Sequence, residues 1–292
     1  MMSIARSEFV PDTALFEFRQ GNFNVTVLSD GHFALPAGTV APEASSDEWL
    51  DIERRLGGSA GTIRAHANIP LIQSGDDLIL IDLGGGGKFQ PTEGRLASSL
   101  AAAGHDRDSI TKVLLTHAHP DHVWGLLGSD GRPRFPNASY HVGVAEWDFW
   151  MDPDFTSSMP SVLHPFAKGA QRDLSAVRER IVLVKDGDDI LPGLHAIATP
   201  GHTPGHTSYA LSGHETMVVT GDVVTNQIVS FEHPAWRFGN DTDKDVGAKT
   251  RQRFVDWAAV DRLLLLGYHF AYPGLGRVGR AGGEYRYHPA YV

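Results

Sequence analysis

The segment from His117 to His122 constrains the fold of this chain more than any other feature. It places four side chains that commonly bind metals within six residues, in the pattern H-x-H-x-D-H, and these are His117, His119, Asp121 and His122. Three more candidate ligands follow much later, in the motifs GHTPGH, GD and GYH, and these are His202, Asp222 and His269. Any fold that uses them together must bring distant segments of the chain to one place.

Each group of candidate ligands follows a short apolar segment that predicts a β-strand. These segments are Val113–Leu115, Ala196–Ala198, Thr216–Thr220 and Leu263–Leu266. Extended backbone places side chains i and i+2 on the same side, so we expect His117 and His119 to point together. Because sites are usually built on loops that follow the strands of a rigid sheet, all the candidate ligands are expected at one sheet edge.

The candidate ligands are sufficient for two divalent metal ions. The first ion is predicted to bind His117, His119 and His202, the second to bind Asp121, His122 and His269, and Asp222 is predicted to bridge the two. Imidazole and carboxylate suit Zn²⁺ or a neighbouring first-row metal, and two such ions about 3.5–4 Å apart activate water for hydrolysis. We therefore predict a hydrolase with two divalent ions, Zn²⁺ foremost, and with Asp121 and Asp222 as catalytic carboxylates. Asp121 is expected to orient the attacking water and to accept its proton.

Two other kinds of metal protein fit the sequence less well. A closed structural site favours four tetrahedral ligands, often cysteines, and this chain has no cysteine. A metal-dependent binding protein without catalysis would lack at least one ligand, whereas all the ligands of two ions are present.

Composition predicts a soluble globular protein without a membrane span, and the hydrolase prediction implies a small-molecule substrate. Of the 292 residues, 41% are hydrophobic and 21% are charged, and no apolar run approaches the ~20 residues that a membrane helix needs. The net charge of −10 disfavours a nucleic-acid partner. The first residues are not followed by the apolar segment of a signal peptide, so we expect a cytoplasmic location.

Residues 1–60 are predicted to form an N-terminal extension that serves dimerisation or lines the pocket, and residues 61–292 to form one hydrolase domain. The extension is expected to contain one strand at 24–28 and one helix at 46–56. Further strands are predicted at 68–72 and 78–81, and further helices at 95–103, within 145–180 and at 243–260.

The glycine run Gly84–Gly87 and the aromatic residues of 145–180 lie outside the ligand motifs. The run is expected to be a flexible loop beside the site, because the phosphate-binding pattern G-x-x-x-x-G-K-[ST] is not met. Trp147, Trp150 and Phe166 form either core or subunit interface, or one wall of an apolar pocket, and Phe89 has the same two interpretations. Candidates for hydrogen bonds that orient the ligands are His206, Thr116, Thr203 and Thr220.

The order H-x-H-x-D-H, GHTPGH, GD and late histidine resembles that of the metallo-β-lactamase superfamily over roughly residues 60–270. This resemblance implies an α/β fold, a four-layer αβ/βα sandwich with a dinuclear zinc site at one edge. A closer resemblance, to the methyl parathion hydrolase-like branch with its lactone and aryl-ester hydrolases, rests on FQPTEGRL at 89–96, DFW at 148–150, KGA at 168–170, TSY at 207–209 and YPGLG at 272–276. It implies a homodimer and an aromatic pocket lined by Phe89, Trp150 and Phe166.

From this resemblance we expect a lactone or an aryl ester as substrate, with methyl parathion-type phosphotriester hydrolysis as a side activity. The alternatives are an acyl-homoserine lactonase and a β-lactam or thioester hydrolase. Lactonases of that kind often carry tyrosine three residues after the bridging aspartate, where this chain has Thr225. Related hydrolases often have glycine where this chain has Trp124, and the indole is expected to narrow the pocket.

Overall fold

The computed structural model describes residues 15–290. Its elements in the first part of the chain are β1 (Phe16–Gln20), β2 (Phe23–Pro36), α1 (Ala37–Val40), α2 (Ser46–Arg55), β3 (Thr62–Ser74), β4 (Asp77–Ile81), α3 (Leu96–Ala102), η1 (Arg107–Ser109), β5 (Lys112–Leu114), α4 (Pro120–Val123), β6 (Ser139–Gly143), α5 (Val144–Trp150), α6 (Phe155–Ser158), η2 (Ser161–Leu163), α7 (His164–Ala176), η3 (Arg178–Arg180) and β7 (Ile181–Val184).

The remaining elements are β8 (Asp189–Leu191), β9 (Leu194–Ala198), β10 (Thr207–Leu211), β11 (Met217–Val219), α8 (Val229–Glu232), α9 (Lys244–Val260), β12 (Leu264–Leu266), β13 (Leu275–Ala281) and β14 (Glu284–Pro289). Within residues 15–290 the strands form two seven-stranded sheets, in the orders β1-β2-β3-β4-β5-β6-β7 and β14-β13-β12-β11-β10-β9-β8. The chain therefore completes one sheet before it builds the other, and strands that follow one another in sequence are neighbours in space.

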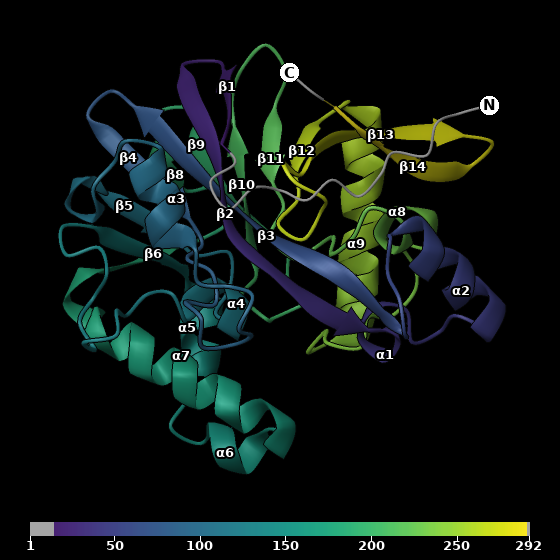
Figure 1. The fold of residues 1–292 in the computed structure, drawn as a ribbon, viewed down its shortest axis with the longest axis horizontal. Coiled ribbons are helices and arrows are strands. Elements are labelled where there is room, and N and C mark those ends of the chain that lie inside the picture. Colours follow the sequence, from purple (N-terminus) through teal and green to yellow (C-terminus); the bar gives the residue numbers. More distant parts are fainter. Residues whose placement is uncertain (1–14, 291–292) are drawn as a thin grey trace.

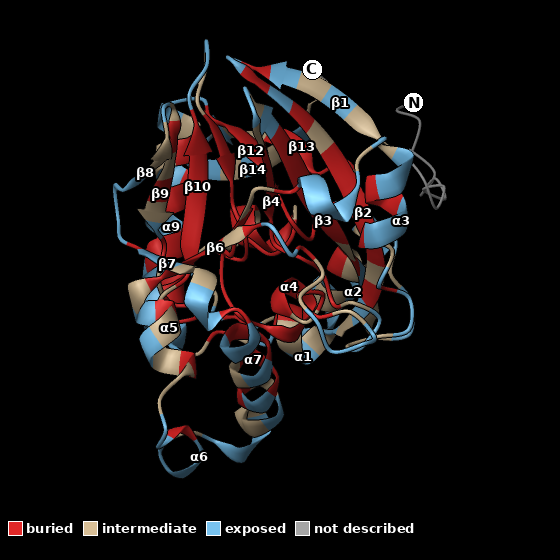
Figure 2. Cartoon of the chain, turned by 90° about the vertical axis from the view of Figure 1, so that its left-hand side faces the viewer, coloured by how far each residue is buried: buried red, intermediate tan, exposed pale blue. Residues whose placement is uncertain are grey.

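Three apolar clusters separate four layers. Side chains of both sheets pack together between them, among them Val27 and Ile79 of the first sheet and Val219 and Leu266 of the second. The outer face of the first sheet packs against α3, α4, α5 and α7, and the outer face of the second packs against α8 and α9 (Figure 1). Figure 2 shows the strands of both sheets as mostly buried and the outer helices as partly exposed. The predicted four-layer sandwich is confirmed.

Local sequence signals explain where several elements begin and end. β3 and β4 pair as an antiparallel hairpin around Gly75, whose φ of +58° suits glycine. Helix α2 begins with a capping box, in which Ser45 and Glu48 each bond the other's backbone N–H. Asp243 caps the start of α9 by accepting from the N–H groups of Asp245 and Val246. The hairpin and these helices agree with the sequence predictions.

The prediction of a single strand at 24–28 in the N-terminal segment is wrong. β1 and the 14-residue β2 form a hairpin that joins the first sheet, and β2 continues to Pro36 beyond a bulge between Ser29 and Gly31. The polar residues around that bulge hide the strand from a pattern of alternation, because tertiary contacts bury them. The boundary predicted at residue 60 stays a prediction.

Among residues 15–290, no helix combines the length and apolar character needed to cross a bilayer. Residues 1–14, on which the expectation of no signal peptide rests, lie outside the described residues.

Candidate metal centre

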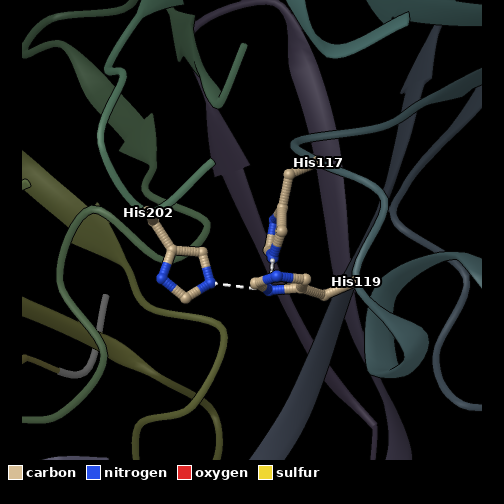
Figure 3. Close-up of side chains that lie close together, drawn as sticks. All are labelled: His117, His119 and His202. Carbon is tan, nitrogen blue, oxygen red and sulfur yellow. Dashed lines mark hydrogen bonds between the residues drawn. The ribbon is translucent and has the colours of Figure 1, made fainter. Parts of the chain in front are cut away.

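Three imidazoles from two loops converge at the first predicted site (Figure 3). His117 and His119 follow β5, and His202 follows β9. Nε2 of His117 lies 3.1 Å from Nδ1 of His119, and the same Nδ1 lies 2.9 Å from Nε2 of His202. All three side chains are buried. The fold thus joins the first three predicted ligands.

The second predicted site adjoins the first. Nε2 of His122, on α4, lies 3.2 Å from Oδ2 of Asp121, and Nε2 of His269, beyond β12, lies 3.4 Å from the same oxygen. Asp222, beyond β11, lies between the two sites: its Oδ2 is 3.2 Å from Nε2 of both His202 and His269, and its Oδ1 is 3.4 Å from Nε2 of His122. All the predicted ligands therefore form one continuous cluster at the edge where these strands end.

The donor atoms of this cluster fit metal ions. A neutral imidazole carries one N–H, yet Nδ1 of His119 faces two other ring nitrogens at hydrogen-bond distance. Within residues 15–290, Nε2 of His122 and Oδ1 of Asp222 are buried and make no hydrogen bond of suitable geometry, although they lie 3.4 Å from each other. Buried polar atoms without partners are rare and destabilising, and ions held between these atoms would satisfy them. Two divalent ions fit these residues, and Zn²⁺ stays a prediction.

The electrostatics of the first site and of Asp222 favour the forms that bind metals. Burial, and then the His202 imidazole, lower the pKa of His119 to about 3. Burial also holds the pKa of His117 well below its usual value. Burial alone would raise the pKa of Asp222, but the surrounding imidazoles, His269 first, hold it well below its usual value. At these three residues neutral histidine and ionised aspartate result, and both are ligand forms. Burial alone would lower the pKa of His122 and His269, but the nearby carboxylates raise both, so an ion at the second site would displace protons from these two imidazoles.

Hydrogen bonds from the opposite ring nitrogen orient three of the histidines. The Nδ1 contacts are from His122 to Oδ2 of Asp82 (2.8 Å), from His202 to Oδ1 of Asp241 (3.0 Å) and from His269 to the carbonyl oxygen of His66 (2.9 Å). With the proton on Nδ1, the Nε2 lone pair faces the cluster. No sequence motif marks Asp82 or Asp241 as a partner of the ligands.

Glu146, at the start of α5, connects the two loops of the first site. Its Oε1 accepts from the N–H of Ala118 (2.8 Å) and from Nε1 of Trp150 (2.6 Å). Its Oε2 accepts from Oγ1 of Thr203 (2.6 Å) and from the N–H of Gly205 (3.2 Å). The side chain is buried, so four donors share one buried carboxylate. Nothing in the sequence pattern distinguishes this glutamate from a surface residue.

His206 and the candidate threonines make hydrogen bonds around the cluster. Nε2 of His206 accepts from the N–H of Asp222 at 2.8 Å, and its Nδ1 lies 2.8 Å from Oγ1 of Thr199. Its Nε2 is therefore engaged with the backbone rather than directed at an ion. The hydroxyl of Thr116 donates to the Asp82 carboxylate, that of Thr203 donates to the Glu146 carboxylate, and that of Thr220 donates to the carbonyl oxygen of Gly221.

A series of aromatic edge contacts links the two sites. Phe33 of β2 lies 5.1 Å from His269 and 5.5 Å from Phe89, measured between ring centres. Phe166 of α7 lies 6.5 Å from Phe89 and 5.9 Å from His119. Two predicted pocket residues thus stand beside the cluster. Phe33 joins them because β2 continues past its bulge at Ser29–Gly31, and no sequence motif marks this phenylalanine.

The two tryptophans near the cluster differ in exposure. Trp150 is 0% exposed, stacks on Phe155 and contacts His119 at 5.7 Å, so it packs in the core, and its predicted contact with substrate stays a prediction. Trp124 is partly buried and lies 6.3 Å from Phe89. A Cβ at residue 169 would lie 2.1 Å from Nε1 of Trp124, so Gly169 in α7 makes room for this indole.

The glycine run is anchored to β2. The Asp30 carboxylate accepts from the N–H groups of Gly85 (3.1 Å), Gly94 (3.1 Å) and Leu96 (2.7 Å), which joins both ends of the segment that carries Phe89. Burial raises the pKa of Asp30 to about 6. The predicted loop beside the site is therefore present, with its two ends held together by one carboxylate.

Comparison with known proteins gives one family. Residues 64–274 match the family model described as the metallo-beta-lactamase superfamily. N-acyl homoserine lactonase AttM of Agrobacterium fabrum is 32% identical over 119 residues, which are 38% of this chain and 39% of AttM. Hydroxyacylglutathione hydrolase of Saccharophagus degradans is 31% identical over 120 residues, which are 40% of this chain and 35% of the relative. The chain thus matches about two fifths or less of the length of these curated relatives.

Two solved structures resemble this one over nearly their whole length. One is AidC, a dizinc quorum-quenching lactonase in complex with the product N-hexanoyl-L-homoserine, and the other is hydrolase AbOPH of the beta lactamase superfamily. Each has a TM-score of 0.88 and 28% sequence identity, and the alignment covers 95% of this chain and 98% of the other.

Proposed function

This chain belongs to the metallo-beta-lactamase superfamily, and we propose that it is a dinuclear metal-dependent hydrolase of small apolar esters. We propose a lactone or an aryl ester as the main substrate, with phosphotriester hydrolysis as a side activity. The proposed ligands of the first ion are His117, His119 and His202, those of the second are Asp121, His122 and His269, and Asp222 is the proposed bridge.

One observation carries this proposal. Three overlapping triads of buried ligand atoms meet at one sheet edge, and the ligand atoms of each triad lie within 4.8 Å of one another. Asp222 lies between the two proposed sites. Buried carboxylates and imidazoles are costly to assemble without an ion, because unpaired buried polar groups lose their hydration. The arrangement therefore supports a metal site that is built for two ions rather than a packed core.

The residues have distinct proposed roles. When bound, two divalent ions would supply Lewis acidity, which lowers the pKa of water and polarises an ester oxygen. Asp121 is suited to orient water and accept its proton: burial alone would raise its pKa, but the imidazole of His122 lowers it, so the carboxylate stays ionised. The hydroxyl of Tyr268 donates to the carbonyl oxygen of Asp121 at 2.6 Å and fixes its backbone. The rings of Phe33, Phe89 and Phe166 are proposed to limit the access of bulk water to the cluster where they lie beside His119 and His269.

A second candidate, an acyl-homoserine lactonase, is favoured by a specific comparison. AidC is a dizinc lactonase, and it shares 28% identity and nearly the whole fold with this chain. A homoserine lactone with an acyl chain combines a strained ester with an apolar tail, which suits an aromatic surface. Thr225 occupies the position where tyrosine is frequent in such lactonases, so the ring-binding contacts would differ.

The first experiment tests the metal assignment. The protein is stripped with a chelator, reloaded with Zn²⁺, and its metal content is measured alongside hydrolysis. We expect two ions per chain, and His119→Ala is expected to lose one ion and most of the activity. His214→Ala, at an exposed histidine between β10 and β11, serves as the matched control and should keep both. A fully active protein without metal would overturn the proposal.

The second experiment tests the substrate. Values of kcat/KM are compared for dihydrocoumarin, N-hexanoyl-L-homoserine lactone and methyl parathion with the same zinc-loaded protein. A preference of at least tenfold for dihydrocoumarin would support the main proposal, and one for the homoserine lactone would support the second candidate. Preference for methyl parathion would make phosphotriester hydrolysis the main activity. If none is hydrolysed, β-lactams and thioesters are tested next.

A further inference from the structure

A buried ion pair contacts the ring of His202 on the side away from the metal cluster. We propose that Asp241 and Arg251 are positioning residues that fix the His202 imidazole in the site it shares with His117 and His119. This inference rests on the proposed function, because it takes His202 as a metal ligand. It assigns to α9 and the loop before it a part in binding one of the two ions.

The contacts run in one line from the cluster to α9. Nδ1 of His202 lies 3.0 Å from Oδ1 of Asp241, and Oδ2 of Asp241 accepts from Nη2 of Arg251 at 2.7 Å. Asp241 and Arg251 are 4% and 1% exposed, so the interaction is shielded from water and salt. Because Asp241 holds the proton of His202 on Nδ1, Nε2 is left to face the cluster.

Arg251 is itself held from several directions. Nη1 donates to the carbonyl oxygen of Trp236 at 2.7 Å, and the guanidinium carbon lies 3.4 Å from the centre of the Phe238 ring. Phe238 packs with residues of α1, α2 and β3 in a separate apolar cluster. The guanidinium therefore cannot swing away from Asp241 without disturbing this packing, which makes it a rigid support rather than a mobile surface charge.

Backbone contacts align the loop of Asp241 with the loop of His202. The N–H of Thr242 donates to the carbonyl oxygen of His202 at 3.0 Å, and the N–H of Asp243 donates to that of Gly201 at 3.0 Å. The side-chain contact between Asp241 and His202 is thus one of three contacts between the same two loops. The backbone contacts therefore help to fix the position of Asp241 relative to His202.

The support is specific to His202. His122 has Asp82 as its Nδ1 partner, and His269 has the carbonyl of His66. Loss of Arg251 leaves both of those contacts intact but leaves the Asp241 carboxylate buried without its cation, which is unfavourable. Loss of such an outer hydrogen-bond partner typically lowers metal affinity 10- to 100-fold. We therefore expect the two ions to respond differently.

The test is a Zn²⁺ titration of the chelator-stripped protein against a chromophoric chelator. Arg251→Met and Asp241→Asn are expected to weaken one of the two binding steps about 10- to 100-fold and to leave the other unchanged. Arg251→Lys should restore part of the lost affinity, since it returns the charge but not the planar fork. Arg253→Met removes the same charge from an exposed position on α9 and should bind both ions like the parent chain.

The outcomes separate this inference from the proposed function. Unchanged affinity for both ions in folded Arg251→Met and Asp241→Asn would overturn it, and so would equal weakening of both steps. If circular dichroism shows that Arg251→Met does not fold, Asp241→Asn decides, because it keeps the volume of the side chain. If the parent chain binds two ions but hydrolyses none of the esters, the proposed hydrolase function is overturned. The role of Asp241 and Arg251 in metal binding can still be tested in that case. A parent chain that binds no ions would overturn both.

Discussion

Replacing Glu146 by glutamine should destabilise the protein measurably, although the two side chains have the same size. The Glu146 carboxylate accepts four hydrogen bonds, two on each oxygen. A glutamine has one acceptor oxygen and one NH₂ group, which donates. One of the two pairs of donors must therefore face the NH₂ group instead of an acceptor. The amide oxygen is expected to stay with Ala118 and Trp150, because both offer N–H groups that can only donate.

The magnitude follows from the other pair of donors. The hydroxyl of Thr203 can rotate and accept from the new NH₂ group, whereas the N–H of Gly205 can only donate and loses its acceptor. A buried donor without a partner costs about 1–3 kcal/mol. Burial raises the pKa of Glu146, so the neutral amide recovers part of the cost of burying a charge. The expected loss in the free energy of unfolding therefore lies in the lower part of this range, about 1–2 kcal/mol.

Urea unfolding of the chelator-stripped protein, followed by tryptophan fluorescence, measures this loss. Glu179→Gln is the matched control, because Glu179 is exposed on η3 and its substitution should stay within about 0.5 kcal/mol of the parent chain. An unfolding free energy for Glu146→Gln equal to that of the control would refute the role of the carboxylate as a shared acceptor between the two loops.

Three other predictions follow from the site. Chelation should lower the melting temperature and Zn²⁺ should restore it, because an ion that binds only the folded chain stabilises it; an unchanged melting temperature contradicts the metal site. Asp82→Asn should weaken one zinc-binding step about 10- to 100-fold in competition titrations, since Asp82 orients His122; unaltered binding argues against this role. In the metal-free protein, burial, and then the Asp121 carboxylate, raise the pKa of Glu93 from 4.5 to about 9. The unfolded chain ionises first as pH rises, so Glu93 lowers stability progressively between pH 4.5 and 9, and Glu93→Gln should flatten this decline in urea unfolding. A parallel decline in the variant would show that Glu93 is not its source.

The convergence of all seven candidate ligands could be predicted from the sequence because these residues obey a local rule. Metal ligands occur in short motifs after apolar strands, and the spacing of His117, His119, Asp121 and His122 fixes which side chains a strand, a tight turn and a helix start present together. The segments that precede His202, Asp222 and His269 are apolar enough for the sequence to predict them as buried strands. The four-layer fold follows from the resemblance of these motifs to one superfamily.

Only the tertiary structure decided which residues support and cover the cluster. Asp241, Glu146 and Phe33 carry no motif, and each acts through a partner on a distant segment: His202, the two ligand loops and His269. The same holds for Asp30, whose carboxylate accepts from the glycine run. The sequence predicts that run only as a loop and does not predict this contact. A metal ligand is recognisable because its chemistry is local, whereas a hydrogen-bond or packing partner depends on sheet register and loop path, which are set by the whole chain.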